Sequence, residues 1–509
     1  KKRLDIKLHS FDVVVGNPPW SEGEYYVSCE HLPYINYVPK PFKYSKVPHT
    51  LSASGEVLAT HVFQAKQILP KEFHSLLDQL KTQSDECFQA IRWAWAYNKP
   101  VGDKSYAQLF VYRALSFVKE DGVIGLLLHA NILFNQSATS REFRKVWLSS
   151  ARIQQVMNFV RVRNLFFGNA IAPFIFACFE PRQSTPRDNY VLYNTVQRTK
   201  AVERLRAVIL TKADRRLIRQ SDFENRDYLW KTYAWGNQQD AALLAALNLE
   251  DRLQDVLERI GSKPGFGFQR GSESPSQTLQ NLRSLQSKNL TWYGPLKDEW
   301  FEEQPRGVKR DPNEIIYRGQ RLMVVRGAKA LHGVCVRLEY QDFSFRHTIY
   351  GIPLTSLPEW QAKLIVGTIW SSLGRYRLFM TAGKWGLWHD EVGSQDILSI
   401  PIRLPNHKDE VVQAITDAVD AIRAWDPHPT KSIWLESIFS RNLQPQPPTE
   451  ILERLDNAVF DLFELSKSEQ DLIRDFARYK FDLFSNGAEA EALKIIKELP
   501  QNLHGTAQN

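Results

Sequence analysis

The chain contains little cysteine and no long apolar run. Its 509 residues include four cysteines, at positions 29, 87, 178 and 335, and no two of them form a Cys-x-x-Cys pair. This spacing indicates neither a disulfide framework nor a zinc site, and we expect no metal. No apolar run reaches the roughly 18 residues of a membrane span, and no signal peptide is visible. We therefore expect a cytoplasmic protein without a membrane partner.

A strong charge of one sign is also lacking. Lys and Arg number 65 against 57 Asp and Glu, which gives a formal net charge of +8. This weak excess favours a polyanionic partner such as nucleic acid, although the mixed charges exclude a purely basic tail. Hydrophobic residues make up 43% of the chain, enough for about two to four domains with cores of their own.

The most informative segment is residues 11–20, FDVVVGNPPW. Residues 13–15 are β-branched and apolar on both faces, which predicts a short strand buried inside a parallel sheet. The strand stops at Gly16, so the turn that follows lies beyond its carboxyl end, where open α/β sheets bind ligands.

That turn, Asn17-Pro18-Pro19-Trp20, carries the predicted chemistry. The two prolines remove two backbone donors and leave nearby carbonyls free to accept hydrogen bonds. Asn17 adds a side-chain acceptor and Trp20 a flat face for stacking, which together suit a planar substrate with an exocyclic amine, such as a flipped adenine. The plain alternative is a strand that ends in a proline turn with a partly buried tryptophan.

This segment resembles motif IV of the amino-methyltransferases, the S-adenosylmethionine (SAM)-dependent enzymes that methylate adenine N6 in DNA. Protein-glutamine methyltransferases share the motif, so it does not settle the substrate. Residues 106–118 have apolar positions at helical spacing, and a Glu-Asp-Gly turn then leads into the apolar run 123–128, as in the same family. One departure is His129, where the family usually has proline, and we interpret it as a loop histidine with its hydrogen bonds satisfied.

A third match is a predicted hairpin, with strands over residues 153–160 and 171–180. The resemblance implies that its turn carries an aromatic residue that stacks on the flipped base, and Phe167 stands at that position. Phe166 and Phe167 can also be ordinary core residues, and we expect one of them to be core. A base held between Trp20 and Phe167 would gain on the order of 1–3 kcal/mol per aromatic face.

The cofactor half of the family pattern is missing. These enzymes bind SAM with a glycine-rich turn after their first strand, but only sixteen residues precede Asn17. The candidate at residues 265–271 follows no Val/Ile run, and we reject it. The sequence starts at Lys1 without Met, and a sheet beginning at Val13 would expose a hydrophobic edge. We therefore expect the C-terminal portion of a longer enzyme, with SAM bound mainly by residues upstream and no cofactor-binding residue identified here.

Residues 21–100 read as an insertion in the catalytic domain, either a cover over the substrate or plain connecting structure. Residues 181–231 contain twelve Lys or Arg and six acids, a net of +6. They predict a basic helical linker, which either grips phosphate or is simply a solvated helix face.

Residues 255–405 change to short strands with glycine turns, followed by an amphipathic helix over 360–379. In order, these features resemble the target-recognition domain of the long adenine methyltransferases of type IIG restriction–modification and related phage-defence systems. Such a domain needs basic residues on turns for phosphate and guanine contacts. The candidates, each of which can also be an ordinary surface or strand-paired residue, are Arg318, Arg321, Arg326, Lys329, Arg346 and Lys384.

The predicted fold class is α/β, with the C-terminal half of a Rossmann-like methyltransferase sheet, an α+β target-recognition domain and a helical tail. The expected divisions are 1–180 (catalytic, with the insertion), 181–254 (linker), 255–405 (recognition) and 406–509 (helical, with amphipathic helices at 452–463 and 472–484 and a disordered end at 501–509).

The predicted function is site-specific, SAM-dependent adenine-N6 methylation, with double-stranded DNA and other subunits of a defence complex as partners. A non-catalytic DNA-recognition subunit is the main alternative, and a protein-glutamine methyltransferase a minor one.

Overall fold

The computed structural model divides into two compact units, Lys1–Ala234 and Trp235–Asn509. The structure describes residues 9–18, 100–102, 105–166, 172–182, 189–271, 276, 278–303, 307–310, 312–329, 333–387, 391–425 and 446–490. The insertion at 21–100, apart from residue 100, and the tail at 501–509 therefore lie outside the described residues, as do Pro19, Trp20 and Phe167.

The first unit is a mixed α/β structure built on a six-stranded sheet of order β1-β2-β4-β3-β5-β6. Its strands are β1 (Phe11–Gly16), β2 (Val118–His129), β3 (Ala151–Asn158), β4 (Phe174–Pro181), β5 (Tyr190–Thr195) and β6 (Arg215–Arg219). The pairs β1–β2 and β3–β5 are parallel, whereas β4 is antiparallel to both of its neighbours. The predicted hairpin is thus present as β3 and β4.

The register brings several strand ends to one edge of this sheet. His129, at the end of β2, pairs with Phe174, at the start of β4. Asn158, at the end of β3, pairs with Ile175 on β4 and with Thr195, the last residue of β5. Gly16, the end of β1, pairs with Leu126 on β2. The carboxyl ends of β1, β2, β3 and β5 therefore lie at one edge of the sheet, which is also where β4 begins.

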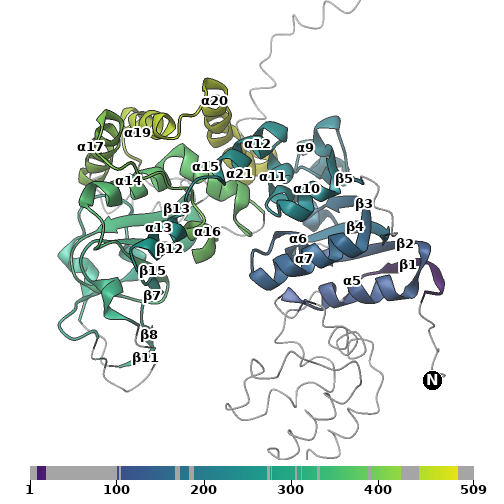
Figure 1. Ribbon diagram of the computed structural model, residues 1–509, viewed down its shortest axis with the longest axis horizontal. Coiled ribbons are helices and arrows are strands. Elements are labelled where there is room, and N and C mark those ends of the chain that lie inside the picture. Colours follow the sequence, from purple (N-terminus) through teal and green to yellow (C-terminus); the bar gives the residue numbers. More distant parts are fainter. Residues whose placement is uncertain are drawn as a thin grey trace, which may run out of the picture. The chain divides into compact units, whose positions relative to one another are not determined.

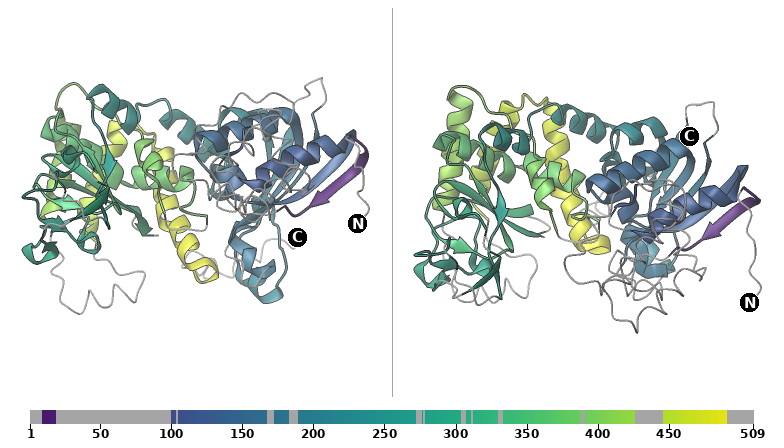
Figure 2. Two further views of the ribbon diagram at one scale, coloured as in Figure 1. Left: turned by 90° about the horizontal axis from the view of Figure 1, so that it is seen from below. Right: turned by 60° about the horizontal axis from the view of Figure 1, so that its bottom comes forward.

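Strand β1 is present where the sequence predicts it, but it lies at the border of the sheet rather than inside it (Figure 2). Val13 is 60% exposed and Val15 76%, because β2 is the only described strand that pairs with β1. The expectation of a buried strand was wrong, whereas the expectation of an exposed hydrophobic edge is confirmed.

The predicted helix before β2 is α5 (Tyr106–Phe117). The Glu-Asp-Gly segment lies within β2 as an irregularity, since Phe11 pairs with Val118 but Val13 pairs with Val123. Glycine is needed there because a Cβ on Gly122 would lie 2.7 Å from the carbonyl oxygen of Asp12. Helices α5 and α7 (Ala138–Ser150) lie side by side and pack on β2 and β3 respectively (Figure 1).

The basic segment differs from its prediction as a helical linker. It contributes two strands, β5 and β6, to the sheet of the first unit. The helices in and after it are α9 (Lys200–Leu205), α10 (Gln220–Asn225), α11 (Leu229–Trp235) and α12 (Gln238–Leu247). An alternation of apolar and polar residues is hard to see in the sequence of β6, because only Ile218 of its five residues is buried.

The second unit contains a four-stranded antiparallel sheet of order β13-β12-β15-β7. Its strands are β7 (Gly265–Phe266), β12 (Arg321–Lys329), β13 (Gly333–Glu339) and β15 (Ile349–Pro353). Shorter strands pair beside it: β8 (Gln269–Arg270) with β11 (Val308–Arg310), and β9 (Ser284–Leu285) with β10 (Phe301–Glu302) and β14 (Ser344–Phe345). Aromatic and aliphatic side chains of these segments, among them Phe268, Tyr317 and Phe345, form one core cluster.

The predicted amphipathic helix over 360–379 is instead two helices, α14 (Glu359–Trp370) and α15 (Ser372–Thr381). Most of both is buried, because α14 packs on β13 and on α17 (Glu410–Ala424). The predicted C-terminal helices are confirmed as α19 (Thr449–Leu462) and, for the second, as α20 (Lys467–Asp475), a π-helical turn and α21 (Phe481–Asn486). No described helix is long and apolar enough to cross a membrane.

Candidate functional site

The candidate site lies at the shared carboxyl edge of the sheet in the first unit. Gly16 ends β1, and the next residue, Asn17, is exposed whereas Pro18 is buried. A buried proline fixes the direction of the chain and leaves the Asn17 amide at the surface of the edge. Of the five residues predicted to bind the base or to react, Asn17 and Pro18 can be placed. Pro19, Trp20 and Phe167 lie outside the described residues.

His129 ends the neighbouring strand β2. Its Nδ1 accepts the backbone N–H of Asn131 at 3.1 Å. Burial lowers the pKa of the imidazole to about 4, so the ring is neutral at physiological pH. The prediction of a histidine with satisfied hydrogen bonds is confirmed, and its position is the strand end rather than a loop.

Three phenylalanines cluster at the base of the hairpin. The ring of Phe166 meets Phe159 and Phe174 edge-on, at centroid distances of 5.0 and 5.6 Å, and Phe159 lies 5.3 Å from Phe174. Phe159 and Phe174 belong to an apolar cluster with Val196 and Val202. Phe166 is 46% exposed, so it covers this cluster without being fully buried.

Sequence reasoning missed two arginines at this edge. Arg161 and Arg163 follow β3, in the short helical turns Val160–Val162 and Arg163–Phe166. Burial, together with the charges of Arg198 and Arg163, lowers the pKa of Arg161 to about 10. Burial and Arg198 likewise lower the pKa of Arg163. Arg198 also pairs with Glu203. The three guanidiniums therefore lie close enough together to disfavour one another's charge. The signal in the sequence is the Arg-x-Arg just before the hairpin turn.

A buried amide lies near the same edge of the sheet. Asn194, next to the end of β5, is 1% exposed, and neither its Oδ1 nor its Nδ2 forms a hydrogen bond with a described residue. Leaving both polar atoms of an amide unpaired costs free energy, so such a group usually has a partner when the protein works. Asn194 pairs in register with Met157, one residue before the end of β3.

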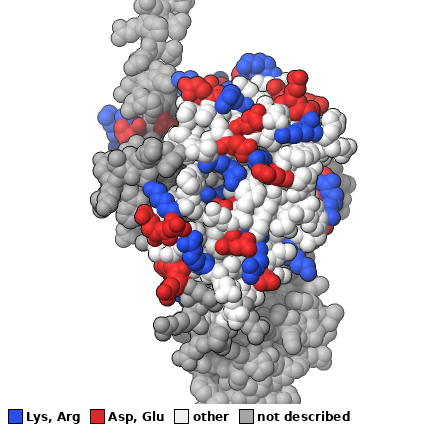
Figure 3. Space-filling model, turned by 90° about the vertical axis from the view of Figure 1, so that its left-hand side faces the viewer, with Lys and Arg blue, Asp and Glu red and all other residues white. Residues whose placement is uncertain are grey.

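The predicted nucleic-acid contacts of the second unit are mostly paired with carboxylates. Arg318 lies 3.5 Å from Glu314 and 3.4 Å from Asp342. Arg346 lies 3.6 Å from Glu302, and Lys384 lies 3.0 Å from Glu391. The face of the molecule seen in Figure 3 shows the same pattern, with basic and acidic side chains interspersed. The side chains of Arg326 and Lys329 lie outside the described part.

The structure overturns the prediction for Arg321. This residue was predicted to contact DNA, but it is 0% exposed. Its guanidinium donates to the carbonyl oxygens of Gly319 and Gln341 and lies over the ring of Phe343. Arg321 therefore holds the turn before β12 together and is not available to a ligand at the surface.

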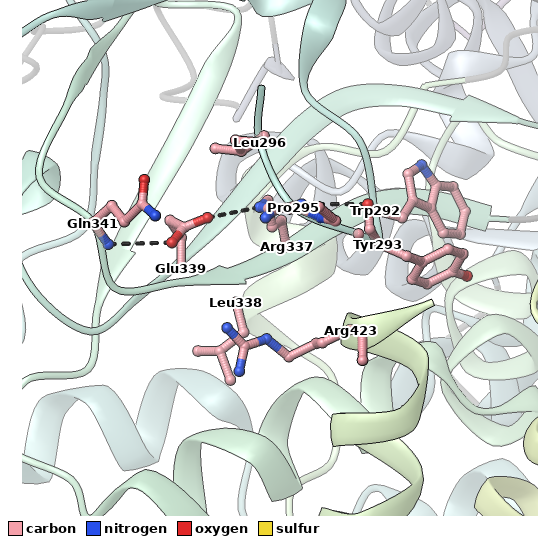
Figure 4. A pocket seen from close by; sticks show the side chains of 11 residues that line it. Trp292, Tyr293, Pro295, Leu296, Arg337, Leu338, Glu339, Gln341 and Arg423 are labelled. Carbon is pink, nitrogen blue, oxygen red and sulfur yellow. Dashed lines mark hydrogen bonds and ion pairs between the residues drawn. The ribbon is translucent and has the colours of Figure 1, made fainter. Parts of the chain in front are cut away.

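One cavity of about 370 Å³ lies within the second unit (Figure 4). Its walls come from residues 292–296, from β13 and the turn after it, and from the end of α17. Two guanidiniums and one carboxylate line it, those of Arg337, Arg423 and Glu339. The cavity could not be predicted from the sequence, because its walls come from segments that are far apart along the chain.

The chain matches no protein-family model and no curated protein. Among solved structures it is similar to the type IIG restriction endonuclease BpuSI, with 12% identity, a TM-score of 0.29, and coverage of 89% of this chain and 54% of that one. The type IIL restriction–modification enzyme MmeI in complex with DNA gives 8% identity, a TM-score of 0.44 and coverage of 93% and 73%.

A nuclease-deletion mutant of the type ISP restriction–modification enzyme LlaGI, bound to a DNA substrate mimic, gives 12% identity, a TM-score of 0.34 and coverage of 96% and 52%. The chain thus spans about half the length of BpuSI and LlaGI. All three solved structures are restriction or restriction–modification enzymes.

Proposed function

We propose that the chain carries the adenine-binding and DNA-recognition parts of a SAM-dependent DNA adenine-N6 methyltransferase in a bacterial restriction–modification or phage-defence system. The observation that carries this proposal is the position of Asn17-Pro18. The pair directly follows β1, which is parallel to β2, at the edge where the carboxyl ends meet. Ligands of open α/β sheets bind at this edge.

The residues present suit adenine N6 as the nucleophile. The lone pair of this amine is delocalised into the ring, so the free amine is a weak nucleophile. The Oδ1 of Asn17 and the carbonyl oxygen of Pro18 would accept the two N6 hydrogens. That would shift the nitrogen toward sp3 geometry and orient its lone pair. No strong base is needed, and the neutral His129 nearby is held by a backbone N–H.

SAM supplies an electrophilic methyl group when bound. The described strands of the first unit end at Gly16, His129, Asn158, Pro181, Thr195 and Arg219, and none of them leads into a glycine-rich turn. The described residues therefore do not form a cradle for SAM, and the role proposed for this edge is to bind and orient the base.

Double-stranded DNA is the proposed partner, together with other subunits of a defence complex in the cytoplasm. Arg163, which has Arg161 and Arg198 as neighbours, supports this role, because guanidiniums pair well with phosphate. In the second unit, Arg318, Arg346 and Lys384 are the exposed candidates, and each would exchange a carboxylate for a phosphate on binding.

The test is methyl transfer by the protein as its own cell makes it. With labelled SAM and duplex DNA, N6-methyladenine should appear in digests analysed by mass spectrometry. Asn17→Ala should lower kcat by at least about a hundredfold, because one oriented acceptor contributes roughly 3 kcal/mol in the transition state. Duplex affinity should change little.

The matched control is Asn225→Ala, an exposed asparagine of the same unit on α10, which should leave methylation unchanged. Methylation by Asn17→Ala at the wild-type rate would refute the role of Asn17. Specific duplex binding without any methylation by the wild type would favour the alternative, a non-catalytic DNA-recognition subunit.

A further inference from the structure

The cavity of the second unit is lined by a buried arginine, Arg337, that has an N–H group without an acceptor among the described residues. Arg337, on β13, is 7% exposed. Its Nε donates to Glu339 at 2.9 Å, and its Nη1 makes only long contacts, of 3.3–3.5 Å, to Thr291 and Tyr293. Its Nη2 donates to no residue within the described ranges. A guanidinium that is nine-tenths buried and lines a cavity with an open N–H group is prepared for an acceptor.

Arg423 adds a second open guanidinium. It lies over the ring of Tyr340, 4.7 Å from the centroid, and its nearest carboxylate, that of Asp420, is 3.9 Å away. Of the described residues, none accepts a hydrogen bond from its side chain. The guanidinium is thus positioned by stacking while its five donors remain available.

Glu339 does not cancel this charge. Its Oε1 accepts the backbone N–H groups of Tyr340 and Gln341, and its Oε2 accepts Arg337. Burial raises the pKa of Glu339, but Arg337 and these N–H groups outweigh burial and hold the pKa below its usual value. Among the residues that line the cavity, two guanidiniums face one carboxylate, whereas Asp420 beside Arg423 is not part of the lining. This excess of one positive charge in the wall favours an anion.

The remaining walls indicate what kind of anion. Pro295 and Leu296 give apolar walls, and the side chain of Gln341, at the opposite end from Trp292, offers an amide that bonds to no described residue (Figure 4). An amide can pair with both the donor and the acceptor edge of a heterocycle. The volume of about 370 Å³ lies at the small end of ligand pockets, which run from roughly 300 to 1,000 Å³.

From this geometry we propose that the cavity binds one nucleotide, with its phosphate on Arg337 and Arg423 and its base against Pro295 and Leu296, toward Gln341. Guanidiniums pair with phosphate oxygens in planar, bidentate geometry, which explains why two of them face one cavity. The nucleotide is either free in solution or part of a DNA strand, and in both cases the same residues would bind its phosphate and its base. This inference goes beyond the proposed function and does not depend on Asn17.

The test is calorimetric titration of the full chain with thymidine monophosphate, a probe without the exocyclic amine that Asn17 would bind. The nucleotide should bind at least about tenfold more tightly than thymidine or inorganic phosphate alone. Arg423→Gln should weaken its binding at least about tenfold. Gln341→Ala should lower the affinity for the nucleotide by a smaller factor and leave the affinity for inorganic phosphate unchanged.

The matched control is Arg474→Gln. Arg474 also lies over an aromatic ring of the second unit, that of Phe460 at 5.0 Å, but it does not line the cavity, and its loss should change nothing. Competition with duplex DNA separates the sources: displacement of the nucleotide points to a DNA strand, and continued binding to a free nucleotide. Absence of binding at millimolar nucleotide, or equal binding by wild type and Arg423→Gln, would overturn the proposal.

Discussion

At the scale of single residues, the neutral His129 makes a prediction about pH. Its pKa is about 4 in the folded chain, against about 6.5 when unfolded, so the folded state disfavours the proton. The stability that follows is complete above pH 6.5 and is lost as the pH falls toward 4. Between pH 7 and pH 5 the protonation of His129 should lower the free energy of unfolding by about 2 kcal/mol. Urea titrations of wild type and His129→Gln at both pH values should show the smaller pH dependence in the variant.

The arginine cluster at the carboxyl edge makes a second prediction. If Arg163 contacts a DNA phosphate, Arg163→Gln should weaken duplex binding and lower the slope of log affinity against log salt by about 1. Fluorescence anisotropy at several salt concentrations measures both. Arg152→Gln is the control, because Arg152 lies near the opposite end of β3 and pairs with Glu180. Equal slopes for wild type and Arg163→Gln would exclude the contact.

How far single residues could be predicted depends on what surrounds them. Asn17 followed from a local pattern, since a strand, a glycine and a proline turn are adjacent in the sequence. Arg321 could not be assigned, because its burial depends on Phe343 and Gln341, which follow it by two strands. The cavity residues were invisible for the same reason: Trp292, Arg337 and Arg423 meet only in the folded unit.

At the scale of elements, the break between α14 and α15 shows why one helix was predicted and two formed. Apolar residues continue through residues 360–379, so the hydrophobic pattern does not mark an end. Ser371 is extended instead, and its Oγ accepts the N–H of Gly374 at 3.2 Å as an N-cap. A Cβ on Gly374 would lie 2.3 Å from the carbonyl oxygen of Thr368, so only glycine allows this close approach.

This cap makes a third prediction. Ser371→Ala removes the side-chain acceptor at the start of α15 and should lower the free energy of unfolding by about 1 kcal/mol. Urea denaturation followed by circular dichroism measures the loss. Ser468→Ala, at an exposed position on α20, should stay within about 0.5 kcal/mol of wild type. A loss no larger than that of this control would mean that packing alone sets the start of α15.

Strands were predicted unevenly. The apolar runs of β2 and β4 can be recognised as strands from the sequence, because they contain β-branched or aromatic residues and much of each is buried. Strand β6 was hidden in the basic segment, since four of its five residues are exposed or half-buried and three are arginines. The sequence also could not give the position of β1 in the sheet, because a border strand and a central one differ in their partners rather than in their own residues.

At the scale of the whole molecule, two compact units with separate cores should unfold in separable steps. Arg144 tests this. It is almost fully buried in the first unit, pairs with Asp227, and donates to the carbonyl oxygens of Ile132 and Asn135. Removing one partner of a buried pair leaves the other unpaired, so Arg144→Met should destabilise the first unit by roughly 3 kcal/mol.

Differential scanning calorimetry should therefore resolve two transitions, only one of which responds to Arg144→Met. For a unit of this size the loss should lower its Tm by roughly 6–12 °C. Arg152→Met is the control, since its exposed pair with Glu180 contributes at most about 1 kcal/mol. Ser371→Ala should shift the other transition alone, because distant sites without shared partners act independently. If Arg144→Met and Ser371→Ala instead shift one common transition, the two units fold as a single cooperative body, and the separation of their cores has no thermodynamic consequence.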